Sequence, residues 1–145
     1  MEKQISRSEM ILQLKVGQVM TKEVPTVDFD DLVAKASRMM MELRLHSLLV
    51  LKYGKPAYML STYDLLKLSY ENAFSETPMD ILRTPIEELV KGQKLITVST
   101  DTVLLDALRI LVDYNIHSVP VIDDNVVMGI LTMMDLARWY KQTHE

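Results

Sequence analysis

Apolar and polar residues follow one another in the first half of this chain in a pattern that predicts five elements. The apolar run at 24–27 is short enough for a strand, and the apolar residues of 32–43 recur at helical spacing. The run at 48–51 is rich in Leu and Val and too short for a helix, so it predicts a buried strand. After a turn, a second strand is predicted at 57–60, and Ser61 begins another helix. The predicted order is therefore strand–helix–strand–strand–helix.

The second half of the chain repeats this pattern 71 positions later without a gap, so that Leu131 matches Leu60. The identical residues include Val19 with Val90, Thr26 with Thr97, Val27 with Val98, Asp30 with Asp101, Ala36 with Ala107, Arg38 with Arg109, His46 with His117, Ser47 with Ser118, Val50 with Val121, Asp64 with Asp135 and Leu65 with Leu136. Asp30 and Asp101 stand just before the first helix of each copy, where a side-chain cap is expected. So long a match indicates an internal repeat, and two copies suit one compact domain with a pseudo-twofold axis.

The repeat divides the chain into four predicted segments. Residues 1–15 form a short amphipathic helix, residues 16–70 the first repeat and residues 84–141 the second. Residues 71–83 are polar, contain Pro78 and form a linker with one turn of helix. The predicted fold class is α/β, with two β-α-β-β-α repeats and a short N-terminal helix.

The start of the second helix in each copy carries the pattern with most chemical content. Ser61 precedes Asp64 by three residues, and Thr132 precedes Asp135 by three. A Ser or Thr followed three residues later by an acid approximates a capping box. The same groups can instead hold a ligand, because a carboxylate accepts from two hydroxyls and a helix start offers free N–H groups. The residues alone leave both interpretations open.

Composition narrows the class of protein. A hydrophobic fraction of 48% and a charged fraction of 25% are ordinary for a globular chain with a core. The net charge of −4 and the absence of a long basic run argue against a nucleic-acid partner. With no cysteine there is no disulfide and no thiolate zinc site, and no apolar run approaches the roughly 20 residues that span a bilayer. Because the N-terminus also lacks an apolar signal core, we expect a cytoplasmic protein without a membrane partner.

No set of residues predicts catalysis. The sequence has no Gly-rich phosphate loop, no defensible Ser-His-Asp order and no close carboxylate pair, and Gly occurs only four times. We therefore expect no enzyme, no catalytic residue, no metal site and no cofactor.

Three stretches resemble CBS domains: Val16-Gly17-Gln18-Val19-Met20-Thr21, Ile116-His117-Ser118-Val119-Pro120-Val121-Ile122-Asp123 and Gly129-Ile130-Leu131-Thr132-Met133-Met134-Asp135-Leu136. The repeat resembles a stand-alone tandem CBS pair, or Bateman module, over nearly the whole chain. The resemblance implies a regulatory module that binds an adenosyl compound such as AMP, ADP, ATP or S-adenosylmethionine, and sometimes NAD or a cyclic dinucleotide. The resemblance implies two clefts between the repeats as the ligand sites, and energy sensing as the kind of regulation.

The resemblance also implies which residues bind. In the family, the Ser or Thr and the Asp of the last helix of one repeat hold the ribose, and the other repeat holds the base and phosphate. One cleft would comprise Thr132 and Asp135 with Thr21, Val24, Pro25, His46, Ser47 and Leu48. The other would comprise Ser61 and Asp64 with Leu95, Ile96, His117, Ser118, Val119 and Pro120. Tyr58 stands where the second copy has Gly129, and this bulk favours the cleft that holds Asp135.

His46 and His117 match a phosphate-facing His of the kinase-regulating gamma subunits. There an Arg follows the His, whereas Ser follows it here, which weakens the prediction of a multiply charged phosphate. Replacement cations would have to come from Lys52, Lys55, Arg44 or Arg138.

The implied partners are the adenosyl ligand, a second copy of the chain in a flat dimer stacked through helices, and an unidentified effector protein. The alternative is a structural or dimerisation module with no nucleotide ligand. A small enzyme acting on a nucleotide is the remaining alternative.

Overall fold

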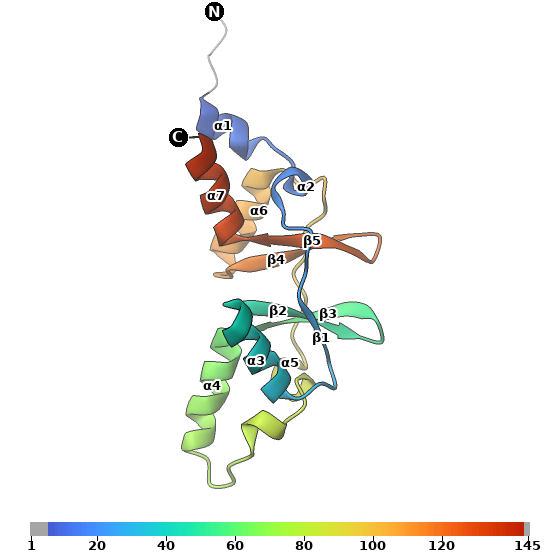
Figure 1. The fold of residues 1–145 in the computed structure, drawn as a ribbon, viewed down its shortest axis with the longest axis vertical. Helices are drawn as coiled ribbons and strands as arrows, with labels where there is room; N and C mark the ends of the chain where they lie inside the picture. The colour runs from blue at the N-terminus through green and yellow to red at the C-terminus, as the bar shows by residue number, and fades with distance from the viewer. Residues whose placement is uncertain (1–5, 144–145) are drawn as a thin grey trace, which may run out of the picture. The chain divides into compact units, whose positions relative to one another are not determined.

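The computed structural model describes residues 6–143, which form two compact units (Figure 1). The terminal unit comprises the described residues up to Val24 and those from Ile96 onward, and the central unit comprises Pro25–Leu95. The chain thus passes from one unit to the other at the start of each predicted repeat, close to its first strand. The opening residues of each repeat belong to the unit that holds the body of the other repeat.

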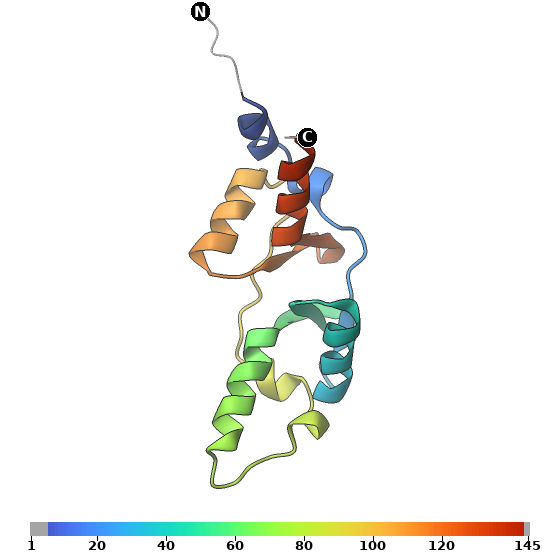
Figure 2. The same ribbon diagram turned by 60° about the vertical axis from the view of Figure 1, so that its left-hand side comes forward.

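The central unit is a three-stranded sheet with helices on one face (Figures 1 and 2). Strand β1 (Thr26–Asp28) pairs in parallel with β2 (Ser47–Lys52), which pairs antiparallel with β3 (Lys55–Ser61). The helices are α3 (Val33–Leu43), α4 (Thr62–Ala73) and α5 (Glu87–Val90), with a 3₁₀ turn, η1 (Ile81–Arg83), before α5. The core comprises Val27, Val33, Ala36, Met40, Leu48, Val50, Leu60, Ile86 and Val90.

The terminal unit repeats this plan around the hairpin of β4 (Ser118–Asp123) and β5 (Val126–Thr132). Its helices are α1 (Arg7–Leu12), α2 (Val16–Val19), α6 (Leu104–Asp113) and α7 (Met133–Thr143). The core comprises Ile11, Val16, Val19, Val98, Leu104, Ala107, Leu111, Val119, Val121 and Leu131. The predicted α/β class and the element order of the repeats are confirmed, with one strand reduced to a single bridge.

The reduced strand is the one predicted at 95–98, where only Val98 pairs, in parallel with Val121. Val98 donates to the carbonyl of Pro120 at 3.1 Å and accepts from Ile122 at 2.8 Å. Extension of a parallel ladder toward residue 96 would need an N–H at position 120, and Pro120 has none. Leu49 occupies the matching position of the first copy and keeps its N–H, which allows a three-residue β1.

The predicted caps at Asp30 and Asp101 are wrong, because α3 and α6 begin later. Their N-cap residues are Leu32 and Val103, which provide no side-chain hydrogen bond. The N–H of Val33 instead donates to the carbonyl of Thr84 at 2.8 Å, and that of Leu104 donates to Leu14 at 2.7 Å. Backbone at or just before the start of the opposite repeat therefore satisfies each helix start.

Candidate functional site

The N-terminus of α4 is a closed capping box. The hydroxyl of Ser61 accepts from the N–H of Asp64 at 3.2 Å. Oδ2 of Asp64 accepts from the N–H of Ser61 at 2.8 Å and from its hydroxyl at 3.0 Å. Asp64 is half-buried, and its second oxygen, Oδ1, has no hydrogen-bond partner among the described residues. The cap is thus complete while one carboxylate oxygen is still available.

The N-terminus of α7 has the same cap and additional bonds. Thr132 accepts from the N–H of Asp135 at 3.1 Å, and Oδ2 of Asp135 accepts from the N–H of Thr132 at 2.8 Å. Oδ1 of Asp135 accepts from the hydroxyl of Thr21 at 2.7 Å and from Nη1 of Arg138 at 3.2 Å. The residue is only 2% exposed. Both oxygens of Asp135 are therefore occupied by groups of the terminal unit itself.

The backbone of Thr21 explains this difference. Thr21 forms an antiparallel bridge with Ile130 on β5, with both N–H···O distances at 2.9 Å. A Cβ on Gly129 would lie 2.6 Å from the carbonyl oxygen of Thr21 and 2.7 Å from Sδ of Met20. Gly129 is therefore required for the close approach of residues 20–21. The absence of a side chain at Gly129, where the first repeat has Tyr58, suggested room for a ligand. Met20 and Thr21 fill that room instead.

The corresponding edge of the central unit is built differently. The repeat shift matches Thr21 with Gly92, which has no side chain and a φ of 84°. The N–H of Met59 donates to the side-chain oxygen of Gln93 at 2.8 Å, so a side chain replaces the backbone bridge. Tyr58 is half-buried against the core of the central unit.

The two His-Ser pairs lie beside the helix start of their own repeat. The carbonyl of His46 accepts from the N–H of Thr62 at 2.9 Å, and that of His117 accepts from Met133 at 2.9 Å. Ser47 is the cross-strand partner of Ser61, and Ser118 is that of Thr132. His46 and His117 are exposed, and Ser118 is buried. The predicted grouping of each His-Ser pair with the Asp of the other repeat stays a prediction.

The remaining predicted residues fall into two sets. Leu48, Val119 and Pro120 are buried, and the first two belong to the hydrophobic cores. Val24, Pro25, Leu95 and Ile96 are half-buried and lie where the chain passes from one unit to the other. The second set therefore offers more accessible apolar surface than the first.

Two of the candidate cations are already paired. Nζ of Lys52 lies 2.7 Å from Glu87, which raises the pKa of this lysine, and 5.2 Å from the ring centroid of Phe29. Arg138 pairs with Asp135. Lys55 and Arg44 are exposed. Arg138 stands three residues after Asp135, a spacing that puts both on one helix face and that the sequence already contains.

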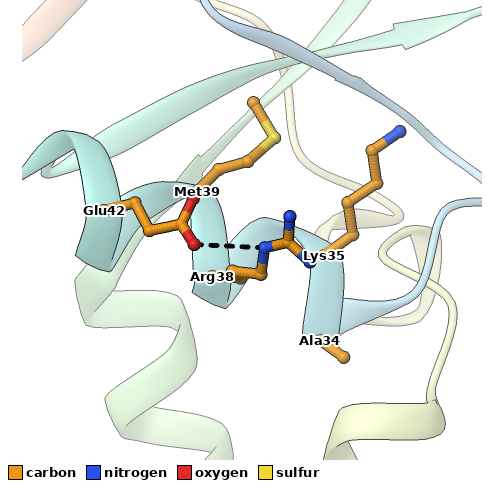
Figure 3. Close-up of a pocket in the computed structure, with 5 residues that line it drawn as sticks. All are labelled: Ala34, Lys35, Arg38, Met39 and Glu42. Atoms are coloured by element: carbon orange, nitrogen blue, oxygen red, sulfur yellow. Dashed lines mark ion pairs between the residues drawn. The ribbon is translucent and has the colours of Figure 1, made fainter.

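Two further features do not coincide with the predicted site. A hollow on α3 is lined by Ala34, Lys35, Arg38, Met39 and Glu42, and Arg38 and Glu42 form an exposed ion pair at 3.2 Å (Figure 3). Asp28, Asp30 and Asp31 gather in the turn before α3. The N–H of Asp28 and then Lys35 donate to Asp31 and lower the pKa of this carboxyl. The three carboxylates are explained by local turn structure.

Comparison with known proteins identifies the fold. Residues 16–71 and 80–142 each match the family described as CBS domain, so the chain belongs to the CBS-domain family. It is 28% identical over 142 residues to the uncharacterised protein MJ1404 of Methanocaldococcus jannaschii, covering 92% of this chain but only 34% of MJ1404. The chain thus spans about a third of the length of that relative.

Solved structures share the fold over almost the whole chain. The structure of CBSX2 in complex with AMP is 26% identical, with a TM-score of 0.70 over 91% of this chain and 99% of that one. The CBS domain pair of protein MJ0100, solved with 5′-methylthioadenosine and S-adenosylmethionine, is 23% identical, with a TM-score of 0.74 over 88% and 96%. Within residues 6–143, no helix combines the length and apolar character needed to cross a membrane.

Proposed function

We propose that this chain is a regulatory module that binds an adenosyl compound and passes the binding event to a partner protein. The observation that carries the proposal is the repeated helix start, Ser61 to Asp64 and Thr132 to Asp135. Each places a carboxylate beside the first N–H groups of a helix. The resemblance to CBSX2, whose structure holds AMP, supports this choice of ligand class.

The chemistry of the helix start suits a ribose. A carboxylate accepts from both vicinal hydroxyls of a sugar, and each charge-assisted hydrogen bond contributes about 1.5–3 kcal/mol net. The helix N-terminus adds a positive dipole end that favours a nearby phosphate. Half-buried Val24 and Ile96 provide apolar surface for a flat base.

The charges favour a ligand with few phosphates. Ser47 and Ser118 follow the two His residues where the gamma subunits have Arg, and Lys52 and Arg138 are engaged in ion pairs. A triphosphate needs several unengaged cations to offset its charge. We therefore expect AMP or S-adenosylmethionine to bind more tightly than ATP.

The exposed face of α4 offers a surface for a second copy of the chain. Tyr63, Leu66, Tyr70 and Phe74 recur at helical spacing, are 68–76% exposed, and form one stripe, the α4 stripe. The rings of Tyr70 and Phe74 contact each other with centroids 5.1 Å apart and planes tilted by 56°. A row of large apolar side chains on one helix is the kind of surface that marks an interaction site.

The α4 stripe is self-complementary when a second α4 runs antiparallel to it. With a twofold axis near the middle of the helix, Tyr63 would meet Phe74 of the second copy, and Leu66 would meet Tyr70. The same register would place exposed Lys67 opposite Glu71. The two copies would thus form two ion pairs around an apolar contact, as an isologous interface requires.

The competing function is a dimerisation module without a nucleotide. The α4 stripe and the buried, fully bonded Asp135 favour it, because neither needs a ligand. The two functions differ in the response to nucleotides.

A thermal-shift and calorimetric panel tests the proposal. The probes are AMP, ADP, ATP, 5′-methylthioadenosine, S-adenosylmethionine, NADH and a cyclic dinucleotide, with guanosine monophosphate as the matched control. A ligand at one hundred times its Kd adds about 2.7 kcal/mol to the free energy of unfolding. A rise in Tm with an adenosyl compound and none with guanosine monophosphate supports the proposal. No response to any probe leaves the dimerisation module as the function.

A further inference from the structure

We infer that Thr21 takes the place of a ligand hydroxyl at Asp135, so that the chain binds one equivalent of adenosyl ligand, at Asp64. This inference rests on the proposed function and specifies which of the two repeated helix starts carries it. It reverses the preference for Asp135 that the sequence suggested.

Both oxygens of Asp135 already accept hydrogen bonds from groups of the terminal unit. Oδ1 accepts a short hydrogen bond of 2.7 Å from the Thr21 hydroxyl and another from Arg138, and Oδ2 accepts from the N–H of Thr132. A hydroxyl that donates to a buried carboxylate is what a ribose would contribute at this position. The side chain of Thr21 provides that contact intramolecularly.

A backbone bridge holds Thr21 beside Asp135. The backbone of Thr21 exchanges two hydrogen bonds of 2.9 Å with Ile130, and Gly129 allows the close approach that these bonds need. A ligand hydroxyl would therefore have to compete with a threonine hydroxyl that this bridge keeps beside the carboxylate. Asp135 is also only 2% exposed. The terminal unit therefore holds its own carboxylate closed.

The central unit lacks each part of this closure. Gly92 matches Thr21 and provides no hydroxyl, and exposed Lys67 matches Arg138. Asp64 is half-buried and uses only Oδ2 within residues 6–143, for its bonds with Ser61. Oδ1 of Asp64 is thus available to accept from a ribose hydroxyl while the cap of α4 stays formed.

Isothermal titration of the full chain with AMP, and separately with S-adenosylmethionine, tests this asymmetry. We expect one equivalent per chain for the wild type and at least a tenfold loss of affinity for D64N. E76Q removes an exposed acidic charge from the same unit and should bind like the wild type. D135N should bind with wild-type affinity despite a lower Tm. Circular dichroism melts confirm that each variant is folded.

The variant T21G gives the terminal unit the glycine that the central unit has at the matching position, Gly92. If Thr21 closes the site, T21G should take up a second equivalent, and the double variant T21G/D135N should return to one. T21G also keeps the inference testable if D135N does not fold.

Three results would overturn the inference alone: two equivalents for the wild type, loss of binding in D135N but not in D64N, or one equivalent in folded T21G. Failure of the wild type to bind any adenosyl probe would instead refute the proposed function, and the inference with it.

Discussion

The hydroxyl of Thr100 donates to the carboxylate of Asp123 at 2.6 Å, and the N–H of Thr100 donates to the same carboxylate at 3.0 Å. These residues join the loop before α6 to the end of β4. In the first repeat, the same two positions hold Phe29 and Lys52, where an ammonium group lies over an aromatic ring at 5.2 Å. The corresponding junction is therefore stabilised by a charge-assisted hydrogen bond in the second repeat and by a cation–π contact in the first.

The Thr100 contact predicts a pH-dependent stability difference. The hydroxyl and then the N–H of Thr100 lower the pKa of Asp123 below its ordinary value of 3.8. A carboxyl with a lowered folded-state pKa stabilises the fold fully above pH 3.8, and this contribution is lost as pH falls through the folded-state pKa. T100V should therefore lower Tm at pH 7, with the difference shrinking below pH 3.8. The measurement is Tm against pH.

Exposed Thr97 provides the control for this prediction, because T97V removes a similar hydroxyl that forms no hydrogen bond within residues 6–143. Its Tm should follow that of the wild type at every pH. A deficit in T100V that does not change with pH would show that packing, and not the carboxylate bond, is responsible.

Gly129 predicts a localised packing defect. In G129A the new methyl group would lie within 3 Å of the Thr21 carbonyl and the Met20 sulfur. Overpacking of this kind costs about 1–3 kcal/mol, and here the backbone bridge to Ile130 must shift. We expect urea denaturation to show a loss of about 2–3 kcal/mol. M128A, at the neighbouring exposed position, should stay within about 0.5 kcal/mol, and equal values for both variants would contradict the close approach.

The repeat, the elements and both capping boxes could be predicted from the sequence because each depends on local pattern. Apolar periodicity determined α3 and α6, and the Ser-x-x-Asp spacing determined the start of α4. The hairpin turns were also local, since Tyr53-Gly54 and Asp124-Asn125 adopt the positive φ angles of a tight turn.

The burial of Asp135 could not be predicted, because it depends on a residue 114 positions away. The described residues up to Val24 pack on the body of the second repeat, so Thr21 meets Asp135 and the carbonyl of Leu14 accepts from the first N–H of α6. Periodicity within one repeat contains no information about this exchange. Pro120 did carry a readable signal: its missing N–H limits the strand that precedes it in sequence.

Ser61 predicts a stability cost that is separate from ligand binding. S61A removes the oxygen that accepts from the N–H of Asp64, and loss of an N-cap costs about 1 kcal/mol. We expect that loss from urea denaturation without ligand. S69A, a matched change at an exposed position within α4, should be neutral or slightly stabilising because Ala favours helix. If S61A and S69A change the free energy of unfolding equally, the cap provided by Ser61 does not stabilise α4.

The α4 stripe predicts a dimer that depends on its apolar residues. L66E places a charge in the middle of the proposed contact and should convert a dimer into a monomer in light scattering coupled to gel filtration, because an unpaired charge at an interface is costly. V126E changes an exposed residue at the start of β5, in the terminal unit, and should leave the mass unchanged. A wild type that is monomeric at high concentration would show that α4 does not bind a second copy.

The antiparallel register makes a sharper prediction about Lys67 and Glu71. K67E should weaken the dimer because it places two acidic residues opposite each other twice, once on each side of the twofold axis. The double variant K67E/E71K reverses both charges and should restore dimerisation, since each glutamate then faces a lysine again. Sedimentation equilibrium of the two variants gives the change in Kd, with at least a fivefold weakening expected for K67E because close like charges are unfavourable. If the double variant stays as weak as K67E, the two helices do not pair in this register.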